Sequence, residues 1–115
     1  MRLTCFTFIG ASVITATSAL ADGYSCAGTE PEWELTIDDV QARFIFPTPT
    51  EMDVPLITKV DGREWPIAYT LVGERDTAIV LLDKAMCDAS QIRAHVLTQR
   101  AELPILLTGC CTVTE

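Results

Sequence analysis

The cysteines, two of which are adjacent, limit most narrowly what this 115-residue chain can fold into. Five are present: Cys5 in an apolar leader, and Cys26, Cys87, Cys110 and Cys111 in the remainder. In a small exported domain, four cysteines are most simply read as two disulfide bonds. The cysteine count therefore predicts a compact crosslinked domain, provided that the chain is exported and the leader is removed.

The first 21 residues have the features of an export signal. Arg2 gives a positive start, residues 3–16 are largely apolar, and Ala19 and Ala21 occupy the two positions that a signal peptidase reads. The apolar run is shorter than the roughly 20 residues that a spanning helix needs. We therefore expect cleavage near Ala21, a periplasmic or secreted location, and a single mature domain of residues 22–115 without a membrane span.

The mature domain is strongly acidic. Because the leader holds Arg2 and no acidic residue, its removal changes the formal net charge from −8 to −9. Such a charge repels phosphate, which argues against a nucleic-acid partner. The remaining 94 residues suffice for one hydrophobic core and contain no repeat or linker, which excludes a multidomain enzyme.

The adjacent cysteines also bear on the disulfide pairing. A bond between Cys110 and Cys111 would close a strained ring, whereas in a strand over residues 108–113 the two side chains point to opposite faces. Each could then reach a different partner. We favour Cys87–Cys110 with Cys26–Cys111, and the swapped pairing stays open. Each bond is expected to stabilise the domain by about 2–4 kcal/mol.

Short strands and turn signals dominate the rest of the chain. Alternating apolar and polar residues predict a strand over residues 33–37, and Asp61-Gly62 suits a tight hairpin turn. Pro55 and Pro66 indicate edges or bulges. Residues 88–93 could form a short helix. The pattern predicts an all-β fold, a small antiparallel seven- or eight-stranded barrel or sandwich, whose other strands cover residues 42–46, 54–60, 64–71, 77–82, 92–99 and 103–113.

No residue pattern supports catalysis or the binding of a metal or cofactor. His95 is the only histidine, and the sequence contains no C-x-x-C. Glu32 and Glu34 could supply the paired carboxylates of a glycosidase, but their spacing is typical of the solvated face of a strand. We therefore assign no catalytic residue, metal ligand or cofactor.

Three residues are candidates for binding: Glu30, Trp33 and Trp65. Gly28 permits a sharp bend, Pro31 stiffens the approach to the next strand, and Glu30 could accept bonds from nearby backbone donors. Such a corner would direct Trp33 inward. Both tryptophans could belong either to the core or to the wall of a ligand pocket.

Two resemblances follow from these motifs. Residues 26–33, C-A-G-T-E-P-E-W, and residues 108–111, T-G-C-C, resemble a group of small exported bacterial proteins of uncharacterised function with a G-T-E-P-x-W motif and a C-terminal Cys-Cys. That resemblance implies location and fold. Tyr24-Ser25-Cys26 is similar to the N-terminal Y-x-C of periplasmic inhibitors of c-type lysozyme, which implies a disulfide-tied lysozyme-inhibitor-like or lipocalin-like β-barrel.

Two functions from different classes are consistent with the sequence. The first is an exported, non-catalytic binding or interaction module of the cell envelope, whose partner is a protein or a small ligand. The acidic charge favours a basic partner such as lysozyme, towards which the chain would act as an inhibitor. The alternative is a periplasmic hydrolase that uses acidic residues, or a protein that handles zinc or copper.

Overall fold

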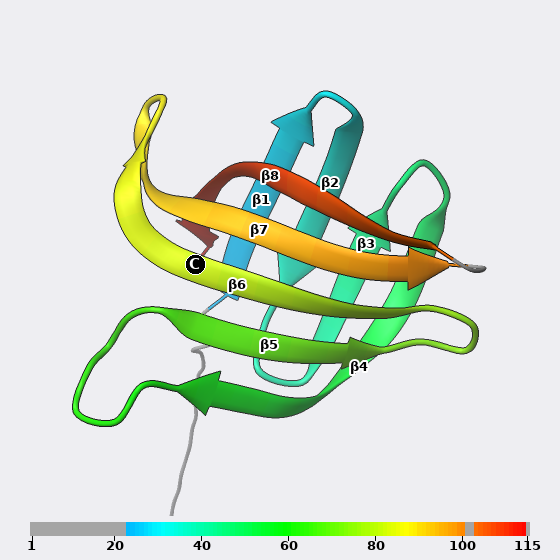
Figure 1. Cartoon of the computed structure of the whole chain (residues 1–115), viewed down its shortest axis with the longest axis horizontal. Helices are drawn as coiled ribbons and strands as arrows, with labels where there is room; N and C mark the ends of the chain where they lie inside the picture. The colour runs from blue at the N-terminus through cyan, green and yellow to red at the C-terminus, as the bar shows by residue number, and fades with distance from the viewer. Residues whose placement is uncertain (1–22, 101–102, 115) are drawn as a thin grey trace, which may run out of the picture.

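The computed structural model describes residues 23–100 and 103–114, which form a closed barrel of eight antiparallel strands (Figure 1). The expected leader with its cleavage site and the expected link at residues 101–102 lie outside the described residues. The all-β prediction is confirmed, in the form of a barrel. The strands are β1 Gly23–Thr29, β2 Glu32–Ile37, β3 Gln41–Ile45, β4 Pro49–Lys59, β5 Ile67–Val72, β6 Thr77–Cys87, β7 Ser90–Arg100 and β8 Leu103–Thr114.

Each strand pairs with the next one along the chain, and β8 returns to pair with β1. This seam runs from Gly23 opposite Thr114 to Ala27 opposite Cys110. In Figure 1, β6, β7 and β8 cross in front of β1, β2 and β3. Because the first and last strands pair with each other, closure removes the two edges that an open sheet would expose.

Alternate side chains from all eight strands fill the interior. The Thr98 hydroxyl is fully buried and donates to the Thr77 carbonyl oxygen over 3.2 Å. Burial of each large apolar side chain contributes roughly 1.5–3 kcal/mol. The interior is therefore a packed core, whose largest fully buried side chains are Phe44, Leu35, Ile37, Leu71, Leu82, Leu107, Val80, Val96, Thr98 and Cys111.

The Trp33 indole crosses the seam where two glycines leave room for it. Its Nε1 donates to the Thr108 carbonyl oxygen over 3.1 Å. A Cβ added at Gly28 would lie 2.9 Å from Trp33 Cε2, and one at Gly109 would lie 2.7 Å from Trp33 Cζ2. The motifs at residues 26–33 and 108–111 thus meet in space, and their glycines are required by the close approach of the indole.

We predict that Gly109→Ala lowers the free energy of unfolding by about 2–3 kcal/mol, because the added methyl group meets both the indole and the Ala27 backbone. Chemical denaturation of the disulfide-bonded protein measures this effect. Gly73→Ala is the control, since its Cβ would lie 3.3 Å from the flexible Met52 side chain at the nearest. Equal losses in the two variants would contradict the steric argument.

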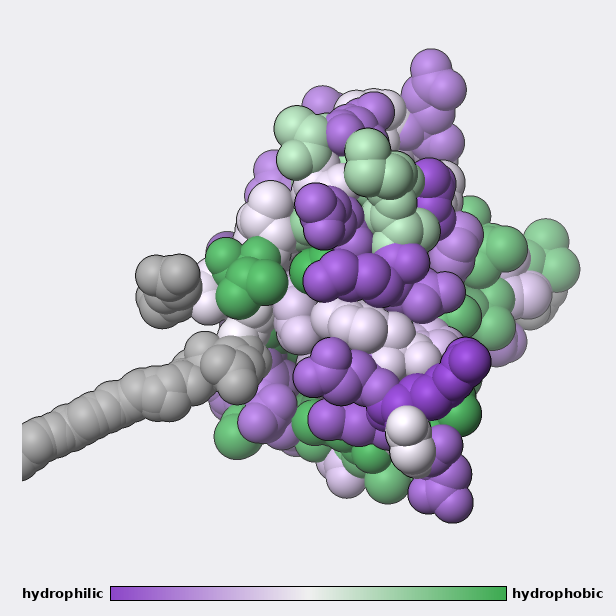
Figure 2. Space-filling model, turned by 90° about the vertical axis from the view of Figure 1, so that its left-hand side faces the viewer, coloured by the Kyte–Doolittle hydropathy of each residue, from purple (hydrophilic) through white to green (hydrophobic). Residues whose placement is uncertain are grey.

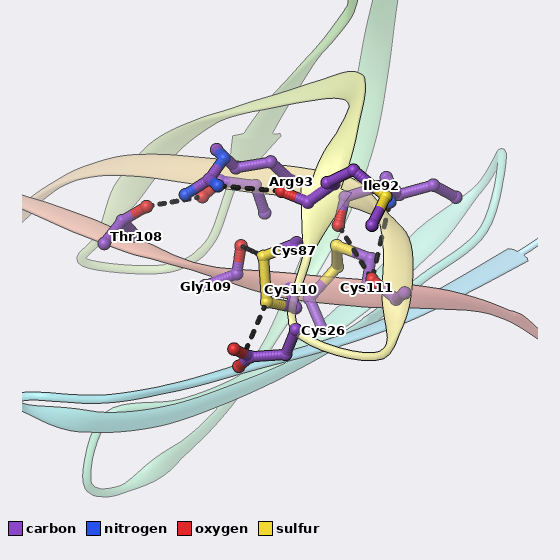
Figure 3. The surroundings of a disulfide bond; sticks show 12 residues. Cys26, Cys87, Ile92, Arg93, Thr108, Gly109, Cys110 and Cys111 are labelled. Atoms are coloured by element: carbon purple, nitrogen blue, oxygen red, sulfur yellow. Dashed lines mark hydrogen bonds between the residues drawn. A yellow bond between two sulfur atoms is a disulfide. The ribbon is translucent and has the colours of Figure 1, made fainter.

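Two disulfide bonds hold the seam and the neighbouring hairpin (Figure 3). Cys26–Cys111 joins β1 to β8 inside the barrel, with Cα atoms 4.0 Å apart. Cys87–Cys110 joins the tip of the β6–β7 hairpin to β8, with Cα atoms 5.6 Å apart. These are the partners favoured by the sequence analysis, and the adjacent cysteines do point to opposite faces of β8.

Removing the bond at the seam should cost more than removing the bond at the hairpin. The two bonds close segments with sequence separations of 85 and 23 residues. Loop-closure entropy alone makes the longer crosslink more stabilising by about 1 kcal/mol. We expect Cys26→Ala/Cys111→Ala to unfold at a lower denaturant concentration than Cys87→Ala/Cys110→Ala. The reverse order would show that the hairpin crosslink carries more of the stability.

The short helix considered for residues 88–93 is wrong. Asp88 and Ala89 form a tight turn between β6 and β7, with Asp88 at a φ of 51°, a region that Asp adopts more readily than most residues. Ile92 and Ala94 face the core, and β7 is paired on both sides. These tertiary pairings override a weak local helix preference. In the described part of the chain, no helix is long and apolar enough to cross a membrane.

The details at the turns and prolines match the expectations from the sequence in one place and differ from them in others. The connection at Asp61-Gly62 is longer than a tight hairpin, since β4 ends at Lys59 and β5 begins at Ile67, although Gly62 does adopt a positive φ of 75°. Pro55 lies in the predicted bulge, where the register shifts between Asp53 and Leu56. The sequence analysis also missed β1 and the first residues of β4, which starts at Pro49, a position that a strand tolerates.

Candidate interaction surfaces

Trp33 and Trp65, the two aromatic candidates for a binding site, lie at opposite ends of the barrel. Trp33 is buried beside Gly28 near the end of β1. Trp65, in the β4–β5 loop, packs edge-on against Tyr24 near the start of β1, with ring centroids 6.1 Å apart. The structure therefore does not bring the two tryptophans into one pocket.

Glu30 lies exposed in the turn between β1 and β2. The sequence analysis expected it to bond backbone donors and so orient Trp33. Instead, the Thr108 carbonyl oxygen orients the indole, and the Trp33 ring also meets Phe44 edge-on at 6.4 Å. The G-T-E-P-x-W segment is thus a structural corner whose glutamate faces solvent.

Trp65 is partly buried and lies beside both charged and apolar residues at its end of the barrel. Lys84 Nζ lies 5.8 Å above the centroid of the Trp65 ring, an arrangement that favours cation–π attraction. A neighbouring hollow of about 520 Å³ is lined by Tyr24, Asp39, Ile57, Lys59, Ile67 and Tyr69. Ile67 and Tyr69 of its lining are buried residues of the packed core, so the hollow lies at the surface of that core.

The side chains singled out for catalysis or metal binding are dispersed. Glu32 and Glu34 are exposed on the outer face of β2, on either side of the buried Trp33. His95 lies on the outer face of β7, opposite Leu81 and Thr108. Within residues 23–100 and 103–114, no three His, Cys, Asp or Glu side chains gather in a way that could hold a metal ion.

Negative charge is concentrated in the first half of the barrel. Residues 23–53, which run from β1 into β4, contain seven carboxylates and one cation, Arg43. Residues 54–114 contain seven carboxylates and six cations. We call the carboxylates of the first half the acidic side: Glu30, Glu32, Glu34, Asp38, Asp39, Glu51 and Asp53.

Two surface hollows of the acidic side combine carboxylates with apolar residues. One of about 330 Å³ is lined by Glu32 and Glu34 together with parts of Trp33 and Ile45. The other, of about 360 Å³, is lined by residues that include Asp38, Ile37, Ala42 and Glu51. Lysine and arginine side chains place their apolar stems on such surfaces and their charges beside carboxylates.

An ion pair lies beside the second hollow. Arg43 Nη1 and Glu51 Oε2 are 2.8 Å apart on β3 and β4, and both side chains are more than half exposed. An exposed pair of this kind contributes at most about 1 kcal/mol. Arg43 therefore neutralises one carboxylate locally without changing the sign of the acidic side.

Asp38 organises the turn between β2 and β3. Its Oδ1 accepts hydrogen bonds from the backbone N–H groups of Val40 over 2.8 Å and Gln41 over 2.9 Å. The bonds from Gln41 and then Val40 lower the pKa of Asp38 from its ordinary value of 3.8, outweighing a small opposing effect of desolvation. Asp38 thus stays ionised to a lower pH than an aspartate without these bonds.

The lowered pKa predicts a pH-dependent contribution to stability. The stabilisation is present above the ordinary value of 3.8 and is lost as the pH falls through the lower folded-state value. We expect Asp38→Ala to reduce the free energy of unfolding by about 1 kcal/mol at pH 7, and by less near pH 3. Denaturation across this pH range measures the difference. Asp39→Ala removes the same charge without the two bonds, so a matching loss in this control would contradict the assignment.

The outer surface of β4 to β8 is apolar, in contrast to the acidic side. Leu56, Thr70, Ile79, Leu97 and Leu106 lie opposite one another in a continuous row across these five strands. The row is open to solvent: Leu97 is 44% exposed and Leu106 is 69% exposed. Two flanking rows complete what we call the apolar face, with Thr58, Ala68, Leu81, His95 and Thr108 on one side and Asp53, Val72, Thr77, Gln99 and Pro104 on the other.

The apolar face is turned towards the viewer in Figure 1. In Figure 2 the same side of the molecule is seen at the right, where hydrophobic residues gather, while the end that faces the viewer is mostly hydrophilic. The face also holds a shallow hollow of about 230 Å³, whose lining includes Val72, Ile79, Leu97 and Pro104. Contiguous exposed apolar surface of this kind marks interaction sites.

Sequence reasoning missed this face because it assigned the apolar runs to strands without asking where alternate residues point. Ile79, Val80, Leu81 and Leu82 are consecutive, as are Ile105, Leu106 and Leu107. In a strand, such runs place apolar side chains on both faces, whereas a barrel buries only one. These runs of consecutive apolar residues are therefore the sequence feature that predicts an exposed apolar surface.

Comparisons with protein-family models, curated proteins and solved structures find no match to this chain.

Proposed function

We propose that the chain is an exported, non-catalytic binding protein of the cell envelope whose acidic side holds a basic partner protein. The observation that carries this proposal is the segregation of charge, with seven carboxylates and one cation in residues 23–53. Complementary charge accelerates encounter and selects partners of opposite sign. A small disulfide-bonded barrel suits an oxidising compartment outside the cytoplasm.

The two hollows of the acidic side provide specific contacts in addition to the long-range attraction. Glu32 and Glu34 lie along the same hollow, on consecutive outward positions of β2. A basic side chain of the partner that enters this hollow would lie between carboxylates and against apolar atoms of Trp33 and Ile45. Because the Trp33 indole is fixed by Thr108 and by the packing of the seam, the hollow needs no rearrangement on binding.

The Y-x-C similarity to periplasmic inhibitors makes c-type lysozyme the first basic protein to test. We expect binding and inhibition that are strongest at low salt and that weaken as salt screens the charges. Titration calorimetry and a cell-wall lysis assay across ionic strength measure the two effects. The absence of both effects at low salt would remove lysozyme as the partner.

Charge reversal tests the acidic side itself. We expect Glu32→Lys/Glu34→Lys to weaken binding by about tenfold or more, because two attractive contacts become repulsive. Asp61→Lys/Glu64→Lys changes the net charge equally in the exposed β4–β5 loop and should weaken binding much less. Equal weakening by both variants would indicate a response to net charge alone and would contradict a site at Glu32 and Glu34.

A column of the immobilised protein extends the test to other partners. Basic envelope proteins should be retained by the wild-type column, elute with salt, and be absent from the eluate of a Glu32→Lys/Glu34→Lys column. Identical eluates from the two columns, together with the absence of lysozyme binding, would overturn the proposal.

A further inference from the structure

We propose that the apolar face is the interface between two copies of this chain, which pack back to back as a two-fold dimer. This inference goes beyond the proposed function and stands on different residues, since the acidic side and the apolar face share only Asp53, at the end of one flanking row. It rests on the composition of the face, on the distribution of charge over the barrel, and on the area available.

The composition of the apolar face favours a partner surface of its own kind. Ile79, Leu97 and Leu106 are three neighbouring residues of the central row, on β6, β7 and β8, and each is exposed by more than a third of its surface. With His95 neutral, Asp53 at the end of one flanking row is the one residue of these three rows that carries a formal charge. A two-fold axis brings the same patch of both copies together, so that branched apolar side chains meet branched apolar side chains.

The distribution of charge disfavours a basic partner at the apolar face and allows a second copy to bind there. The chain has a formal net charge of −8, so two copies repel each other unless they meet where no carboxylates lie. The middle of the apolar face provides such a region, because five of the seven carboxylates of the acidic side lie on β2 and in its flanking turns, and Glu51 and Asp53 lie in the first part of β4. A basic partner would find no carboxylate in the middle of the face to neutralise its charge.

The rim of the face is compatible with the same arrangement. Asp83 and Arg93 lie opposite each other in the row that follows Leu81 and His95. The rim therefore presents both signs of charge at one place. In a two-fold dimer each copy offers the same mixed rim to the other, which allows pairing across the interface without a net charge of either sign.

The area is sufficient for a reversible dimer. Neighbouring strands lie about 4.8 Å apart and alternate residues about 6.7 Å apart, so three rows across five strands, with their side chains, cover about 500 Å². Two copies would then bury at most about 1,000 Å² in total, the lower limit for a specific interface, because the closed barrel curves away from the contact at β4 and β8. We therefore expect a dimer that dissociates in the micromolar range.

Sedimentation equilibrium of the purified, disulfide-bonded protein tests the inference without any partner present. We expect the wild-type protein to convert from monomer to dimer as its concentration rises from the low micromolar to the millimolar range. Leu97→Glu should raise the dissociation constant by about a hundredfold or more, because the symmetry buries two carboxylates in one interface. Thr36→Glu, on the outer face of β2, adds the same charge and should leave the dissociation constant within about threefold of the wild-type value.

Leu106→Glu provides a second disruptive variant at a more exposed position, where folding is less affected. Circular dichroism and melting curves establish that each variant is folded, and only folded variants are compared. A wild-type protein that stays monomeric throughout the series would overturn the inference. So would a dimer that withstands both leucine substitutions, or one that Thr36→Glu weakens as much as Leu97→Glu does.

Measuring both dimerisation and partner binding on the same variants tests the two proposals separately. Loss of dimerisation in Leu97→Glu with unchanged binding of a basic protein would support the interface and leave the proposed function intact. Unchanged dimerisation in Glu32→Lys/Glu34→Lys, combined with lost binding, would likewise assign the two activities to the two sides of the barrel.

Discussion

The contact of the Trp33 indole with the β1–β8 seam is the interaction on which the rest of the structure depends. A barrel is stable only if its first and last strands meet, and here they meet over five residue pairs. The indole lies across both strands because Gly28 and Gly109 leave space for it, and its N–H bonds to Thr108. The buried Cys26–Cys111 bond lies within the same seam. Closure of the sheet, and with it the division into an inner and two outer surfaces, follows from this small set of contacts.

The acidic side and the apolar face both arise because alternate residues of each strand point outward. They differ in which residues fill those outward positions. In β2, outward positions are filled by Glu32, Glu34 and Thr36, so that the strand has one buried and one charged face. In β6, the outward positions include Ile79 and Leu81, so that both faces are apolar. The sheet therefore has an asymmetry that its regular hydrogen bonding does not require. Side-chain choice, and not backbone geometry, distinguishes the acidic side from the apolar face.

Much of the fold was predictable from the sequence, because alternation and turn residues are local signals. The strand at Trp33, the bulge at Pro55 and the opposed directions of Cys110 and Cys111 follow from the two-residue period and from the missing donor of proline. The turn at Asp88 did not follow, because helix preference is also local and only the pairing of β7 on both sides overrides it. The candidate binding residues were harder to predict from the sequence. Trp33 and Trp65 were grouped by residue type, although their separation depends on the positions of Gly28 and Tyr24 along β1.

The nested order of the crosslinks affects how the chain acquires its covalent structure. When a chain emerges from its N-terminal end, β1 is the first strand to appear and β8 is the last, so the barrel stays open until almost every residue is present. Cys26 must await Cys111 over a separation of 85 residues, and Cys87 emerges in the meantime. Among the four cysteines of the described residues, oxidation during emergence would therefore first join Cys26 to Cys87, a non-native pair. Maturation of this barrel accordingly calls for either delayed oxidation or thiol–disulfide exchange.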